Sequence, residues 1–217
     1  MTKESKSLGQ ENLLVPKAQL GDLESFEALV NLYEKRIYHI AYKLVGSPHD
    51  AEDILQETFL KAFENLQKFR GESSFYTWIV KIAVNAALQQ MNKQGRHPMV
   101  SLTVSNSEDD NFRPEEIAAW EEDPEKRYSR EETRQILEQA IASLPVIYRT
   151  VFLLRDVEDL PLQDIAGTLG ISLPAAKSRL IRARLELREK LGRFLKKKGA
   201  PVYYGAHQHD DSGDVRN

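Results

Sequence analysis

The stretch LQDIAGTLGISLPAAKSRLI, residues 162–181, contains two short helical patterns separated by a glycine. Ile165 is spaced to pack inward, and Ala166 is small enough for two helices to cross closely. Gly170 suits the turn, and Ser172 suits the N-cap of a second helix. This arrangement predicts a helix-turn-helix.

The second helix of this motif combines an apolar stripe with a polar, basic outer face. Its expected buried positions are Ala176, Leu180, Ala183, Leu187 and Leu191. Its outward positions carry Lys177, Ser178, Arg179 and Arg182. Such a face can lie in the major groove, where Arg and Lys contact guanine edges or phosphates. The alternative is a solvated basic face, but a hairpin used only for packing does not need one, so DNA binding is favoured.

Charge is unevenly distributed along the 217 residues, although the net charge is only −3. Nine acidic and three basic residues lie between Glu108 and Arg127, whereas ten basic and two acidic residues lie between Lys177 and Lys198. The acidic middle and basic C-terminal segment indicate nucleic-acid contact by the latter.

Composition and motifs also argue against several classes of protein. The chain has no cysteine, so it has no disulfide and no Cys-ligated zinc. It has no apolar run of 18 or more residues and no N-terminal signal-peptide pattern, so we expect a cytoplasmic protein without membrane insertion. No phosphate-binding Gly loop, Ser-His-Asp pattern or HExxH motif names an enzyme chemistry.

Helical periodicity without strand-like alternation predicts an all-α chain with two small helical domains joined by a flexible acidic linker. The expected organisation is a first domain at 12–94, a linker at 95–128, a second domain at 129–196 and a disordered tail at 197–217. Helices are expected at 23–45, 48–68, 75–93, 129–142, 145–156, 162–169 and 173–195, with a short one around 115–121. Expected helix ends include the N-caps Asp22 and Ser47 and the terminating Gly46.

One apolar helix carries an unexpected polar stripe. In RGESSFYTWIVKIAVN, residues 70–85, Trp78, Lys81 and Asn85 fall within about 60° of one another on a helical wheel. By spacing alone, burial of Trp78 and Asn85 in the core is favoured. The alternative is a surface on which aromatic rings stack with unstacked bases, while the amide and the ammonium contact a base edge and a phosphate.

Three blocks match a known family. They are DAEDILQETFLKAF at 50–63, FRGESSFYTWIVKIAVNAA at 69–87, and the pair DIAGTLGIS and AAKSRLIRARLELREKL at 164–172 and 175–191. In these blocks the chain resembles a bacterial RNA polymerase sigma factor of the sigma-70 family, extracytoplasmic-function (ECF) group, and is similar to envelope-stress sigma factors. The resemblance covers residues 12–195.

This resemblance implies a promoter-specificity subunit with no catalysis and no cofactor, serving a stress or envelope regulon. Its partners would be core RNA polymerase (β′ clamp helices and β flap), promoter DNA and an anti-sigma factor. Core binding would use Asp53, Gln56, Glu57, Leu60 and Glu64. The −10 element would meet Phe69, Arg70, Ser73, Ser74, Tyr76, Trp78, Lys81 and Asn85. The −35 element would meet Lys177, Ser178, Arg179 and Arg182.

The pattern departs from the family in the helix-turn-helix, where Pro161 replaces the usual Ser or Thr cap and residues 174–176 replace a Gly-Thr-Val run. A stand-alone helix-turn-helix regulator is the alternative function. Residues 50–87 discriminate against it, because such a regulator needs neither a polymerase-binding face nor a single-strand-binding surface. The tail residues His207, His209, Asp210 and Asp211 could bind a divalent metal, but a disordered tail is favoured.

Overall fold

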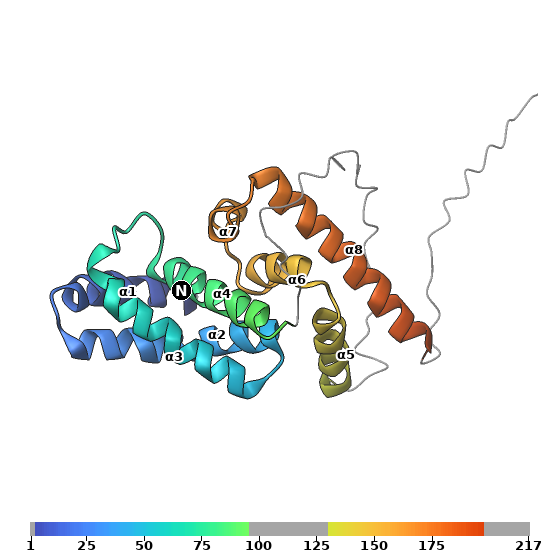
Figure 1. Ribbon diagram of the computed structural model, residues 1–217, viewed down its shortest axis with the longest axis horizontal. Helices are drawn as coiled ribbons and strands as arrows, with labels where there is room; N and C mark the ends of the chain where they lie inside the picture. Colours follow the sequence, from blue (N-terminus) through green and yellow to red (C-terminus); the bar gives the residue numbers. More distant parts are fainter. Residues whose placement is uncertain (1–2, 96–129, 198–217) are drawn as a thin grey trace, which may run out of the picture.

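The computed structural model describes residues 3–95 and 130–197, and no strand occurs in these ranges (Figure 1). The first domain comprises α1 (Lys3–Gln19), α2 (Leu23–Val45), α3 (Pro48–Asn65), a 3-10 turn (Leu66–Lys68) and α4 (Phe75–Lys93). The second comprises α5 (Arg130–Ala142), α6 (Val146–Phe152), a π-helical segment (Leu153–Val157), α7 (Leu162–Leu169) and α8 (Leu173–Lys197). The predicted all-α class with two helical domains is confirmed.

The predicted helix bounds agree closely with those observed, with one omission. The helix expected at 145–156 is divided into α6 and the π-helical segment. α1 was not predicted, although Val15 and Ala18 are buried on it. The expected tail begins at 197, but Lys197 is the last residue of α8, and residues 198–217 and the helix expected around 115–121 lie outside the described residues.

Several helix ends follow local chemistry, and one differs from the prediction. Gly46 and Gly170 terminate α2 and α7 in the left-handed region, with φ of 73° and 64°. Ser47 and Ser172 each accept a hydrogen bond from the backbone N–H three residues on, at 3.3 Å. Asp22 occupies the N-cap position of α2, but its carboxylate accepts a bond from a serine hydroxyl of the first turn rather than from the backbone.

α4 is the central helix, since it packs against α2 and α3 and also against α7 of the second domain (Figure 1). A helix that is apolar around most of its circumference is buried on more than one side, which explains the long apolar run in its sequence. Neither α4 nor any other described helix is long and apolar enough to cross a membrane. The buried residues of α4 are Phe75, Tyr76, Thr77, Ile79, Val80, Ala83, Val84, Ala86, Ala87 and Met91.

A polar contact joins the two domains at Glu158, which follows the π-helical segment. Its carboxylate, whose side chain is 10% exposed, accepts bonds from the Tyr76 hydroxyl at 2.5 Å and from the Arg36 guanidinium at 3.0 and 3.2 Å. The Arg36 guanidinium also lies 3.9 Å from the centre of the Tyr76 ring. Burial, together with the Glu158 carboxylate, raises the pKa of Tyr76 far above its ordinary value, so its hydroxyl stays protonated and remains a donor.

We expect Glu158→Ala to weaken the contact between the domains by about 2 kcal/mol, because it leaves the Tyr76 hydroxyl buried without this acceptor. The chain has no cysteine, so dyes can be attached after Gln67→Cys and Arg188→Cys, and energy transfer between them reports the docking. The matched control is Glu138→Ala, which removes an exposed ion pair within α5. Equal transfer efficiency in the Glu158 variant and in the control would contradict this role of Glu158.

Candidate nucleic-acid interface

A loop of residues 69–74 precedes α4 and presents its tip to solvent. Gly71 has a φ of 70°, a conformation that favours glycine, and Arg70 and Glu72 beside it are exposed. Ser74 ends the loop as the N-cap of α4, because its hydroxyl accepts a bond from the Thr77 N–H at 3.0 Å. The hydroxyl of Ser74 is therefore engaged with the backbone, whereas the tip of the loop is accessible to a ligand.

Three aromatic side chains pack together where this loop meets α4. The ring centre of Phe69 lies 5.1 Å from that of Trp78 and 5.9 Å from that of Phe75, and Phe75 lies 5.6 Å from Trp78. Phe75 is fully buried, and Phe69 and Trp78 are half-buried. Phe75 and Tyr76 are therefore not available for the stacking surface that was considered as the alternative, and the half-buried Trp78 ring packs against Phe69.

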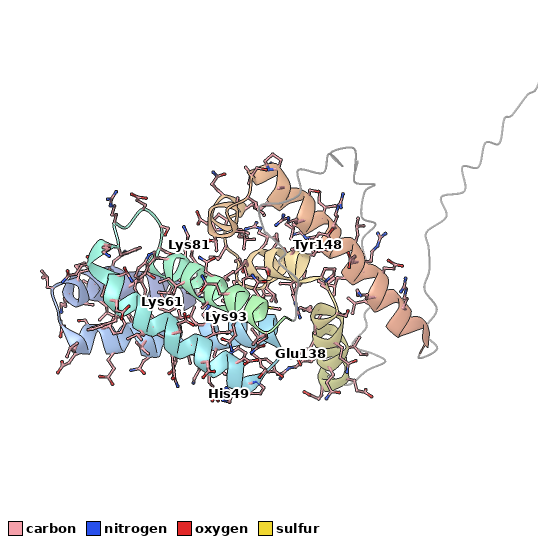
Figure 2. All side chains as sticks on the ribbon, in the orientation of Figure 1. His49, Lys61, Lys81, Lys93, Glu138 and Tyr148 are labelled. Atoms are coloured by element: carbon pink, nitrogen blue, oxygen red, sulfur yellow. The ribbon has the colours of Figure 1, made fainter. Side chains whose placement is uncertain are left out.

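The polar part of the predicted stripe does lie on the surface. Lys81 and Asn85 are exposed on α4, so burial of Asn85 in the core is wrong. Figure 2 shows Lys81 on α4 and Lys61 on α3. A shallow groove of about 330 Å³ is lined by Lys61, Asn65, Lys68, Trp78 and Ile82.

α1 forms a second groove with the other side of the loop. Its volume is about 480 Å³, and its lining includes Asn12, Pro16 and Gln19 from α1 and Arg70 and Ser73 from the loop. Sequence reasoning missed the contribution of α1. The signal was present, because Glu11, Val15 and Ala18 follow the i, i+4, i+7 spacing of one helical face, but a carboxylate at such a position was not recognised as buried.

The outer face of α3 is acidic around exposed apolar side chains. Asp53, Gln56 and Glu64 are exposed, and Glu57 is half-buried and paired with Lys61 at 2.5 Å. Leu60 is 59% exposed. Phe63 is 48% exposed and makes an edge contact with Phe26, with ring centres 5.0 Å apart. All five residues predicted to bind polymerase therefore lie on or beside this face.

The four residues predicted to read DNA on α8 differ in exposure. Lys177 is exposed, whereas Ser178, Arg179 and Arg182 are half-buried. Burial lowers the pKa of Arg179, although the guanidinium remains charged under ordinary conditions. Arg184, also on α8, is paired with Asp156 at 2.7 Å. Lys177 is thus the most accessible cation among the four.

The described residues include one group with metal-ligand character. His49, Asp50 and Asp53 bring ligand atoms within 4.8 Å of one another. The Asp50 Oδ1 atom already accepts hydrogen bonds from Gln90 at 2.9 Å and Gln94 at 3.1 Å. This arrangement is that of a structural carboxylate which links α3 to α4. The tail residues considered for a metal lie outside the described residues.

Comparisons with known proteins agree with this architecture. The family model for sigma-70 region 2 matches residues 29–97, and the model for sigma-70 region 4 matches residues 134–187. The chain is 35% identical over 175 residues to the RNA polymerase sigma-H factor of Pseudomonas aeruginosa, with 81% of this chain and 90% of that protein covered. It is 36% identical over 174 residues to the ECF RNA polymerase sigma-E factor of Escherichia coli K12, with 80% and 90% covered.

Solved structures give the same result. The chain is similar to the sigma factor RpoE, solved in complex with the anti-sigma factor NepR from Bartonella quintana, with a TM-score of 0.58, 25% identity and coverage of 78% of this chain and 98% of that one. It shares its fold with CnrH, solved in complex with the cytosolic domain of CnrY, with a TM-score of 0.59, 21% identity and coverage of 85% and 98%.

These matches do not support the alternative function of a stand-alone helix-turn-helix regulator. The chain carries a sigma-70 region 2 in addition to the region 4 that contains the helix-turn-helix. The loop, the polar strip of α4 and the helix-turn-helix lie in the two matched regions. The chain therefore belongs to the ECF group of the sigma-70 family, the RNA polymerase sigma factors that direct promoter recognition.

Proposed function

We propose that this sigma factor divides its work among three surfaces: the outer face of α3 for core polymerase, the loop and polar strip of α4 for the melted −10 element, and the start of α8 for the −35 element. The observation that carries the proposal is the exposure of Lys81 and Asn85 beside a loop supported by an aromatic cluster. A strip of this kind can contact a phosphate and the edge of an unstacked base. The chain itself needs neither catalytic residues nor a cofactor for this role.

The α3 face suits a protein partner that carries basic residues. Exposed Leu60 and Phe63 supply apolar contact area, and acidic side chains surround them. Carboxylates form strong charge-assisted bonds with arginines. We assign this face, with Asp53, Gln56, Glu57, Leu60 and Glu64, to the clamp helices of the β′ subunit.

The −10 surface contains residues of two kinds. Arg70, Lys81 and Asn85 are exposed and would contact DNA directly. Phe69, Ser74 and Trp78 would hold the loop in shape, and Ser73 lines the groove beside it. Tyr76 is buried against Glu158 in the docked arrangement, so its use in DNA binding requires the two domains to separate.

In the second domain, α8 would bind the −35 element, and the β flap of core polymerase would hold this domain. Accessible Lys177 would contact phosphate or a base edge, with Ser178, Arg179 and Arg182 beside it. The proposed site of action is the cytoplasm, on promoters of a stress or envelope regulon. Because RpoE was solved in complex with the anti-sigma factor NepR, we propose that this chain is also held by an anti-sigma factor.

Core binding is tested by pull-down with core RNA polymerase, followed by run-off transcription. We expect Leu60→Ala to weaken core binding about tenfold, because it removes an apolar anchor at the centre of the α3 face. The control is Leu13→Ala, which truncates an exposed leucine of α1 and leaves α3 intact. If the unmodified chain fails to bind core polymerase, the proposed function is wrong.

We expect Asn85→Ala to reduce promoter opening by about one order of magnitude and to leave closed-complex binding intact, since a base edge becomes available only after melting. Permanganate reactivity of the −10 region measures opening. Asn92→Ala, another exposed amide on the same helix, is the matched control. Wild-type reactivity in the Asn85 variant would remove Asn85 from the DNA-binding surface.

Recognition of the −35 element is tested with Arg182→Ala. We expect a loss of about 1–3 kcal/mol and weaker discrimination at one base pair, measured with duplexes selected by the wild-type holoenzyme from a random pool. Arg188→Ala, an exposed arginine further along α8, controls for general loss of positive charge. A loss that is equal for every −35 sequence would make Arg182 a phosphate contact rather than a base-reading residue.

A further inference from the structure

We propose that α1 positions the −10 loop, and that Glu11 and Gln19 are the positioning residues that hold its two ends. Only the expected effect on DNA binding rests on the proposed function. The positioning itself follows from contacts within the first domain.

Glu11 holds the end of the loop that leads into α4. Its side chain is buried, with 5% of the residue exposed, and one carboxylate oxygen accepts the Phe75 N–H at 2.6 Å. The other oxygen accepts the Tyr33 hydroxyl at 2.5 Å. Phe75 is the first residue of α4, where backbone N–H groups lack partners within the helix and negative charge is favourable. Glu11 therefore binds a donor that the helix cannot satisfy by itself.

Gln19 holds the opposite end of the loop. Its side-chain amide donates to the carbonyl oxygens of Leu66 at 3.0 Å and Phe69 at 2.8 Å. These carbonyls lie at the start of the 3-10 turn and at the first residue of the loop. One NH₂ group has two hydrogens, so both bonds can form at once.

The spacing of Glu11 and Gln19 along α1 allows both side chains to reach the loop. Glu11 and Gln19 are eight positions apart, which is about 12 Å along a helix and about 80° around it, so both can face the loop. α1 is docked separately, through buried Val15 and Ala18 against the rest of the domain. The rigid helix thereby keeps the loop ends at a set separation, while the exposed tip around Gly71 stays accessible.

This arrangement determines the shape of the groove beside the loop. Gln19 and Glu11 line the 480 Å³ groove together with Arg70 and Ser73, two of the residues proposed to meet the −10 element. A loop free at either end would sample many shapes, and ordering it on binding would cost affinity. Preorganisation by α1 should therefore raise both affinity for single-stranded DNA and discrimination between bases.

The variants that test this inference are Glu11→Gln and Gln19→Met. Glu11→Gln keeps size but replaces one of two acceptor oxygens by a donor group, and Gln19→Met keeps length but removes both donated bonds. The matched control is Leu14→Ala, which removes packing of α1 against the core without removing a bond to the loop. Each variant is measured at the same number of degrees below its own melting temperature, so that differences in overall stability do not affect the comparison.

The first measurement needs no DNA. Hydrogen exchange in the full chain should show faster exchange over residues 69–77 in the Glu11 and Gln19 variants, with unchanged protection in α2. The Leu14 variant should leave this loop unchanged. Wild-type exchange of the loop in both Glu11 and Gln19 variants, or equally fast exchange in the Leu14 control, would overturn the positioning role whatever the protein binds.

The second measurement uses holoenzyme and a fork-junction DNA whose single-stranded −10 segment has been selected by the wild-type holoenzyme from a random pool. We expect about tenfold weaker binding for each variant and smaller penalties for base substitutions in the −10 segment, with core affinity and −35 duplex binding retained. Undiminished affinity and discrimination in these variants would overturn the inference. If the wild-type holoenzyme selects no sequence, the proposed function fails instead.

Discussion

Burial of α4 on two sides is the constraint on which the rest of the molecule depends. The helix contacts α2 and α3 of its own domain and α7 of the other, so most of its circumference must be apolar. Only a narrow strip remains for polar side chains, and Lys81 and Asn85 occupy it. One helix therefore forms the core of the first domain, supports the second and offers a polar surface, which confines the proposed −10 surface to that strip and the adjoining loop.

The start of α4 is held by polar groups of its own N-cap and of two distant parts of the chain. Glu11 accepts the Phe75 N–H, Ser74 accepts the Thr77 N–H, and Glu158 accepts the Tyr76 hydroxyl. Buried polar groups are costly when they are unpaired, so these bonds favour one arrangement of loop, helix and neighbouring domain. Two of the acceptors are carboxylates distant in sequence. The geometry of the loop therefore depends on tertiary contacts as well as on its own residues.

Much of the fold could be predicted because its signals are local. Gly170 and Ser172 mark a turn and a cap within a few residues, and the bounds of α2 through α4 follow from apolar spacing. The site was predicted less completely. Asp53 and Lys81 are exposed, as their predicted contacts require, and Asn85 is exposed although spacing alone favoured its burial, whereas Tyr76 is buried and Phe63 is partly exposed. Apolar spacing indicates which side of a helix is buried, but it does not identify what covers that side.

The sequence by itself determined the helices from α2 onward, the division into two domains and the family, because periodicity, caps and motif blocks are properties of neighbouring residues. Only the tertiary structure decided that Trp78 supports the loop, that Tyr76 joins the domains and that α1 holds the loop ends. The physical reason is that a buried donor requires an acceptor but does not specify where in the chain that acceptor lies. Glu11 lies 64 positions from Phe75 and Glu158 lies 82 from Tyr76, and such pairs are set by packing.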